Sequence, residues 1–167
     1  MDEQAIGGGS GEQMGKSSAE MADNSGPLEK RILSKNWSVR AGAYDELTKM
    51  SADAPSGCKA DFMKEHIGQW KVYLKDNNPG ALEKALNCFN IFIDKIHKSI
   101  LSPEDVNPIL SMLIEKCLTH MKPVLKKLAG ESILLLFEAF ESFEESQDTL
   151  TGLAGHKVPK VSVFCFF

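Results

Sequence analysis

The sequence has few features that mark metal centres, secreted proteins or membrane spans. Its four cysteines, Cys58, Cys88, Cys117 and Cys165, lie far apart and form no Cys-x-x-Cys or Cys/His cluster, so we expect no zinc site. The longest solid apolar run, "ILLLF", is far shorter than the roughly 20 residues of a membrane helix. The N-terminus is polar and rich in Gly and Ser, which argues against a signal peptide. We therefore expect a reduced, cytoplasmic protein that does not enter a membrane.

The sequence also has little excess charge. The net charge of −4 belongs entirely to the first 26 residues, which contain five acidic residues and a single basic residue, Lys16. From Pro27 onward, 18 basic and 18 acidic residues balance. General nucleic-acid binders and membrane-surface binders need a net basic face, so neither class is expected.

Residues 1–26 have the composition of a disordered acidic tail, rich in Gly and Ser and without periodicity. Within them, "SGEQMGKSS" resembles the phosphate-binding pattern GxxxxGK[ST] at Gly15, Lys16 and Ser17. Ser10 occupies the place of the first glycine, and no apolar strand precedes the motif. Such a loop needs its strand and helix to hold it, so we expect neither a nucleotide nor any other cofactor.

From Pro27 onward, apolar residues recur every three or four positions, which is the spacing of α-helices. No convincing strand alternation is present. Ser102, Pro103 and Asp105 form a helix-start signal with a capping box. The predicted helices are marked by Leu28–Leu33, Val39–Met50, Met63–Leu74, Leu82–Ile96, Val106–Leu118 and Leu125–Phe143.

Turns that contain Trp or Pro recur about every 40 residues, which with two helices per unit is typical of HEAT-type repeats. They centre on Trp37, Asn78-Pro79, Lys122-Pro123 and Lys157–Pro159. The predicted fold is all-α: an α-solenoid of HEAT-type helix pairs over residues 27–167, with three complete pairs and one partial pair. The last residues, including Phe164, Phe166 and Phe167, have no polar capping repeat after them, so we expect self-association through this end.

Catalysis finds little support. The four histidines, His66, His97, His120 and His156, fall in different repeats and in no ligand motif such as HExxH. No nucleophile stands beside a base. The sequence therefore predicts a protein without enzymatic activity.

In a stack of helix pairs, the turns inside the pairs line one narrow edge. This edge is expected to show Lys35, Asn36, Trp37, Asp76, Asn77, Asn78, His120, Lys122, His156, Lys157 and Lys160. An edge that is aromatic at one end and basic along the rest suits an acidic protein partner, with Trp37 as the anchor. On the pattern alone, a Trp37 that instead fills a gap at the end of the core stays equally open.

The stretch "LEKRILSKNWSVRAGAYDEL" resembles the opening repeat of a TOG domain, the tubulin-binding HEAT array of the microtubule-polymerase family. Trp37, Arg40, Tyr44 and Asp45-Glu46-Leu47 fit that motif in order. The segments "DNNPGALEKALNCFNIFI", "CLTHMKPVLKKLAGESILLLFE" and "GLAGHKVPKV" resemble the second, third and fourth repeats. The resemblance covers about residues 27–163 and is greatest to an N-terminal TOG domain, with the fifth and sixth repeats absent.

The resemblance implies a flat domain whose turn edge binds one αβ-tubulin dimer or a microtubule end, at microtubules, spindle and centrosome. It implies that Trp37, flanked by Lys35, packs on β-tubulin, and that Asn77 and Asn78 add contacts there. It also implies that Lys122 pairs with acidic surface nearby, and that Lys157 and Lys160 lie towards α-tubulin. The alternative function is a HEAT adaptor that binds a peptide or protein on its helical face.

Overall fold

The computed structural model describes residues 26–139. Seven α-helices, one 3-10 helix and one π-helix lie within this range. They are α2 (Leu28–Ile32), α3 (Trp37–Asp53), α4 (Asp61–Ile67), α5 (Trp70–Tyr73), α6 (Pro79–Lys95), η1 (Lys98–Ile100), α7 (Pro103–Met112), η2 (Leu113–Leu118, the π-helix) and α8 (Pro123–Ala139). No strand occurs among them, and the only β-pairing in this range is an isolated parallel bridge between Cys58 and Ile96.

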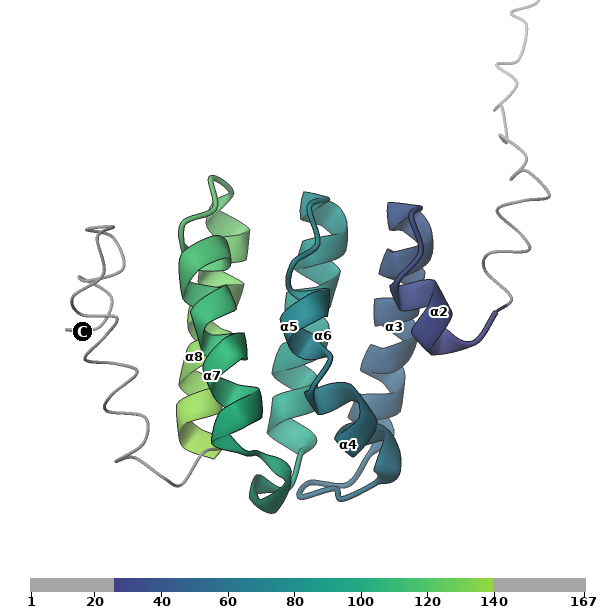
Figure 1. Ribbon diagram of the computed structural model, residues 1–167, viewed down its shortest axis with the longest axis vertical. Coiled ribbons are helices and arrows are strands. Elements are labelled where there is room, and N and C mark those ends of the chain that lie inside the picture. Colours follow the sequence, from purple (N-terminus) through teal and green to yellow (C-terminus); the bar gives the residue numbers. More distant parts are fainter. Residues whose placement is uncertain (1–25, 140–167) are drawn as a thin grey trace, which may run out of the picture.

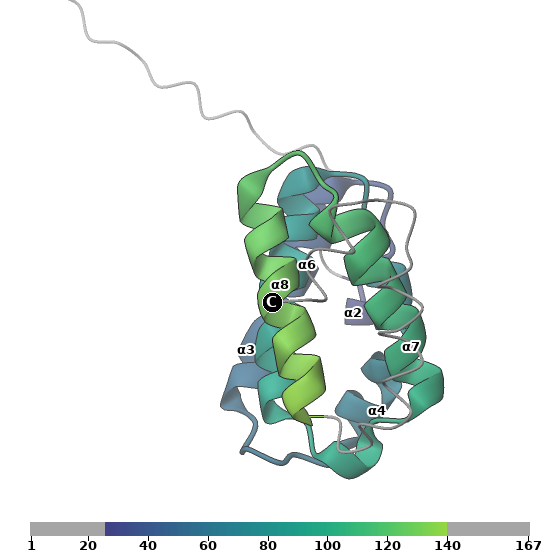
Figure 2. The same cartoon turned by 90° about the vertical axis from the view of Figure 1, so that its left-hand side faces the viewer.

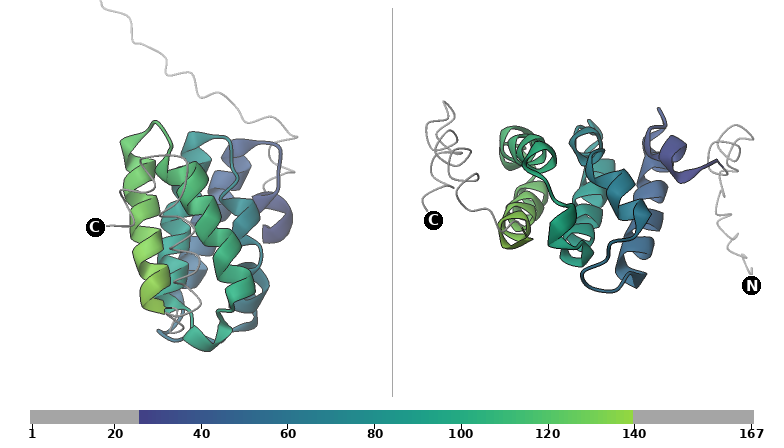
Figure 3. Two further views of the ribbon diagram at one scale, coloured as in Figure 1. Left: turned by 60° about the vertical axis from the view of Figure 1, so that its left-hand side comes forward. Right: turned by 60° about the horizontal axis from the view of Figure 1, so that its bottom comes forward.

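The helices form three pairs that stand side by side in two layers. Helices α3, α6 and α8 make one layer, with α6 packed between α3 and α8 (Figure 1). Helices α2, α4, α5 and α7 with η2 make the other layer, which is seen from the end in Figure 2 and from a third side in Figure 3. The prediction of an all-α, HEAT-type solenoid is confirmed. The predicted fourth pair, the N-terminal tail and the C-terminal phenylalanines lie outside the described residues.

The core is continuous through the three pairs, and Trp70 lies near its centre. Its ring is fully buried and packs edge-on against Phe89 and Phe92, with centroid separations of 4.9 and 5.3 Å. Its indole N–H has no hydrogen-bond partner within residues 26–139, so Trp70 acts there as an apolar filler. Trp37 differs from Trp70 in this respect, since 50% of Trp37 is exposed to solvent.

Side-chain caps fix where the long helices begin. The side-chain oxygen Oδ1 of Asn36 accepts from Ser38 N–H at 3.0 Å at the start of α3. At the start of α6, the side-chain oxygen of Asn78 accepts from the N–H groups of Gly80 and Ala81. The predicted cap at Ser102 is confirmed, since its hydroxyl oxygen accepts from Asp105 N–H at 3.3 Å. The ends of the turns before α3 and α6 are thus tied to the helices that follow them.

Two of the predicted helices are interrupted. The stretch Met63–Leu74 divides into α4 and α5 around Gly68, a poor helix former. A methyl group at Gly68 would only be in ordinary van der Waals contact with Asp105, so the interruption reflects the low helix propensity of glycine and not a close approach. The stretch Val106–Leu118 changes from α-helix to π-helix at Leu113.

His66 is almost completely buried, and its Nδ1 lies 3.0 Å from the Tyr73 hydroxyl. Burial lowers the pKa of His66 below its ordinary value of 6.5, although Glu29 and Glu65 oppose the shift. Well above pH 6.5 the His66 ring is neutral in both the folded and the unfolded chain. As the pH falls through 6.5, His66 takes up a proton in the unfolded chain before it does so in the folded chain, so the free energy of unfolding should decrease. We expect a lower urea midpoint at pH 5.5 than at pH 7.5.

The variant His66→Gln keeps a polar partner for Tyr73 but removes the titration. The difference between its two midpoints should be smaller than that of the unchanged protein. An equal difference in both proteins would show that other groups, and not His66, set the acid sensitivity.

Candidate functional site

The three turns inside the helix pairs lie at the same end of the molecule, at the top of Figure 1. They are the first turn (residues 33–36), the second turn (74–78) and the third turn (119–122). We call these turns, together with Trp37 at the start of α3, the turn edge. The helix repeat brings together residues that are about 40 positions apart in the sequence.

Several of the predicted site residues are exposed on the turn edge. Trp37 and Lys35 mark its first part, Asn77 the second turn and Lys122 the third turn; all four are exposed. Asn78 is only partly exposed, and its side-chain oxygen is occupied as the cap of α6. Asn36 and His120 are likewise only partly exposed, and His156, Lys157 and Lys160 lie outside the described residues.

The Trp37 ring bridges the first and second pairs while remaining half-exposed. A methyl group at Gly80 would lie 3.6 Å from ring carbon Cζ3, so the ring lies close to the start of α6. Trp37 also lines a groove of about 420 Å³ between α3 and α6, whose walls include Thr48 and Lys84. Of the two environments that the sequence left open for Trp37, the exposed one applies.

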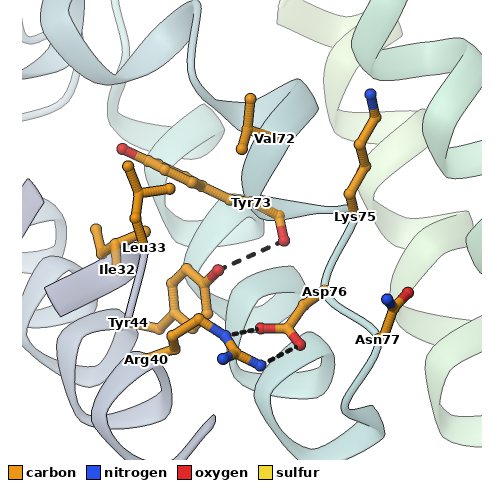
Figure 4. Close-up of a pocket in the computed structure, with 9 residues that line it drawn as sticks. All are labelled: Ile32, Leu33, Arg40, Tyr44, Val72, Tyr73, Lys75, Asp76 and Asn77. Atoms are coloured by element: carbon orange, nitrogen blue, oxygen red, sulfur yellow. Dashed lines mark hydrogen bonds and ion pairs between the residues drawn. The ribbon is translucent and has the colours of Figure 1, made fainter. Parts of the chain in front are cut away.

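The prediction that Asp76 is displayed on the edge is wrong. Only 2% of its side chain is exposed, and it forms a two-bond ion pair with Arg40, with Nε–Oδ2 at 2.6 Å and Nη2–Oδ1 at 2.7 Å (Figure 4). Asp76 Oδ1 also accepts from Asn78 N–H at 2.8 Å. A buried carboxylate needs such partners, and here they come from the preceding helix pair and from its own turn.

Arg40 joins the first turn to the second. Besides Asp76, its Nη1 donates to the backbone oxygens of Ser34 at 2.7 Å and Lys35 at 3.1 Å. The hydrogen bond to Asp76 raises the pKa of Arg40, which therefore stays charged. One guanidinium thus fixes the spacing between the turn that precedes Trp37 and the turn that carries Asn77.

Sequence reasoning missed two features of the edge. Met121 in the third turn is 92% exposed, which is unusual for a large apolar side chain, and it stands beside Lys122. Lys116 reaches from η2 to the second turn and bonds to the Lys75 backbone oxygen and the Asn77 side chain. Met121 could have been noticed as an apolar residue inside a polar turn, whereas nothing local in the sequence indicates the reach of Lys116.

Within residues 26–139 no three His, Cys, Asp or Glu side chains gather as a metal site, and none of the helices there is long and apolar enough to cross a membrane. The three cysteines of this range are buried and form no disulfide with one another. A pocket of about 290 Å³ beside the Arg40–Asp76 pair is lined partly by Leu33 and Val72, and its charged pair is already satisfied (Figure 4).

The fold and the edge define a class of protein: a HEAT-type helical solenoid that presents its turns along one side. The family model described as "XMAP215/Dis1/CLASP, TOG domain" matches residues 23–167. The chain therefore belongs to the XMAP215/Dis1/CLASP TOG-domain family, which confirms the resemblance seen in the sequence.

Three curated proteins illustrate the relationship. Over 81% of this chain, the spindle pole body component alp14 of Schizosaccharomyces pombe is 33% identical, and the match spans 17% of that protein. Centrosomal protein 224 of Dictyostelium discoideum is 31% identical over 82% of the chain, and Protein mini spindles of Drosophila melanogaster is 25% identical over 83%. Each of these two matches spans 7% of the relative, so the chain corresponds to a small part of these proteins.

A solved structure of TOG-domain arrays, from work on tubulin recruitment and assembly by microtubule polymerases, has the same fold. It superposes with a TM-score of 0.68 and 20% sequence identity, over 82% of this chain and 28% of that one. At this level of identity the similarity concerns the fold alone, and it supports the assignment of the chain to the helical solenoids.

Proposed function

We propose that the chain is a non-enzymatic module that binds the αβ-tubulin dimer or microtubule ends through its turn edge and so regulates microtubule growth. The observation that carries the proposal is the half-exposed Trp37, 50% accessible, on an edge that also shows Lys35, Asn77 and Lys122. A large aromatic ring held in the open by a rigid helix start is typical of a binding anchor. Membership of the TOG-domain family supports the choice of partner.

Each part of the edge has a proposed role. Trp37 packs on β-tubulin, with Lys35 and Asn77 at its side, and Asn78 adds its free amide group. Met121 supplies a second apolar contact at the third turn, where Lys122 pairs with acidic surface. From the sequence, we further propose that Lys157 and Lys160 extend the basic edge towards α-tubulin. The names of the relatives, which refer to spindle poles, centrosomes and spindles, support a place of action on spindle and centrosomal microtubules.

The direct test mixes the full chain with purified αβ-tubulin and follows complex formation by size-exclusion chromatography and by analytical ultracentrifugation. A complex of one chain per dimer is expected. Tubulin that elutes unchanged at the highest workable concentrations would overturn the proposed function.

Charge reversal at Lys122 should slow the association with tubulin. Rim charges steer diffusing partners together, and their effect is screened over about 8 Å at physiological ionic strength. We therefore expect Lys122→Glu to lower the association rate by about three- to tenfold at low salt and to reduce the salt dependence. Stopped-flow fluorescence measures both quantities.

The matched control is Lys64→Glu, because Lys64 lies on α4 at the end of the molecule away from the turns (Figure 1). This variant carries the same change in net charge. If both variants slow association equally, the lysine edge has no special role in steering.

The groove between α3 and α6 favours a second candidate, the HEAT adaptor that holds a peptide on its helical face. Thr48→Trp would fill the groove without changing the turns. Binding of any partner that is lost with Thr48→Trp but retained with Lys122→Glu would favour the adaptor over the tubulin module.

A further inference from the structure

We propose that Lys116 is a positioning residue, which holds the second turn in the form that presents Asn77 to the partner. The inference rests on the proposed function, since it concerns the same edge. Lys116 lies in the third helix pair, and its two acceptors lie about 40 residues earlier in the sequence. It therefore joins two repeats at the edge itself.

The contacts of Lys116 converge on one short segment. Its Nζ donates to the backbone oxygen of Lys75 and, at 3.3 Å, to the side-chain oxygen of Asn77. Asn77 is exposed, and this hydrogen bond favours one orientation of its side-chain amide. The hydrogen bonds are charge-assisted, which makes them stronger than bonds between neutral groups.

The second turn is thereby held from both sides. Arg40 in the first pair binds Asp76, and Lys116 in the third pair binds the residues before and after Asp76. Each of the three residues from Lys75 to Asn77 is then bonded to a neighbouring helix pair. A turn fixed in this way loses little conformational entropy when a partner binds, which is the basis of preorganisation.

The local helix geometry supports a dedicated role for Lys116. It lies in the π-helix η2, where hydrogen bonds span five residues and change the angular register of the last turn. Leu113, Ile114 and Cys117 still point into the core, while Lys116 is partly exposed and reaches the second turn. π-Helical turns are uncommon and occur often at functional sites.

The test compares Lys116→Met with Lys116→Arg, and uses Lys64→Met as the control for lost charge. With Lys116→Met, nuclear magnetic resonance of the full chain should show a shifted Asn77 side-chain amide signal and faster amide exchange over residues 75–78. Affinity for tubulin should fall about tenfold, whereas Lys116→Arg, which can still donate, should restore most of it. Lys64→Met should change neither readout.

A double-mutant cycle with Asn77→Ala separates positioning from direct contact. If Lys116 acts through Asn77, Lys116→Met should weaken binding much less in the Asn77→Ala background. Equal losses in both backgrounds, or an unchanged Asn77 signal in Lys116→Met, would overturn the inference. Failure of the unchanged chain to bind tubulin would instead overturn the proposed function, and with it the presenting role. The resonance experiment would still report whether Lys116 fixes the turn.

Discussion

Trp37→Ala should weaken tubulin binding about 30-fold or more while leaving the protein folded. A central aromatic anchor often costs about 2 kcal/mol or more when it is truncated, and each 1.4 kcal/mol corresponds to a factor of ten in the dissociation constant. Full burial of a large apolar side chain stabilises a protein by about 1.5–3 kcal/mol, and half of Trp37 is already exposed. The free energy of unfolding should therefore decrease by only about 1 kcal/mol. Isothermal titration calorimetry and urea denaturation measure the two effects.

Met50→Ala is the matched control, because Met50 is an exposed apolar residue on the same helix, α3, and lies near its opposite end. It should leave tubulin affinity unchanged. If Trp37→Ala instead unfolds the chain, while the molecules that remain folded bind normally, then Trp37 is a core residue and the proposed anchor is wrong.

The architecture could be predicted from the sequence because its signals are local. Apolar residues repeat at the helical spacing, and each turn carries Asn or Pro at the following helix start, as at Asn78 and Pro79. A period of about 40 residues then places the turns at one edge. The repeat alone therefore places Trp37, Lys35, Asn77 and Lys122 on the same side of the molecule.

The connections between turns could not be predicted, because they depend on the distance between helix pairs. Asp76 stands in a polar turn and has the appearance of a solvated carboxylate, yet its partner Arg40 is 36 residues away. The π-helical register of η2 is equally invisible, since the pattern Val106, Leu110, Leu113, Cys117 fits an ordinary α-helix. The proposed contact residues lie on the surface of each repeat and can be read from its pattern, whereas the residues that align them depend on how one repeat packs on the next.

Of the variants considered, Arg40→Met, which breaks the Arg40–Asp76 pair, should lower the free energy of unfolding the most. Arg40→Met would leave a carboxylate that is 2% exposed without its counter-ion, and breaking a buried pair from one side costs about 3–5 kcal/mol. A domain of this size is stable by about 5–15 kcal/mol, so the urea midpoint should fall markedly. Lys84→Met is the control: its pair with Asp45 also joins the first two repeats, but both side chains are 50% exposed, and such a pair contributes about 0–1 kcal/mol. Equal effects of the two variants would contradict the importance of burial here.

The double variant Arg40→Met/Asp76→Asn separates stability from alignment of the turn edge. It removes both charges, so no uncompensated ion stays buried, and the new amide oxygen can still accept from Asn78 N–H. Much of the stability lost in Arg40→Met should return. The bonds from Arg40 to Ser34 and Lys35 stay absent, so the first turn is no longer held against the second. We expect tubulin affinity to remain about tenfold reduced although the chain is folded, because Trp37 and Asn77 are then presented without a fixed separation. Recovery of both stability and full affinity would show that packing between α3 and α6 alone aligns the edge.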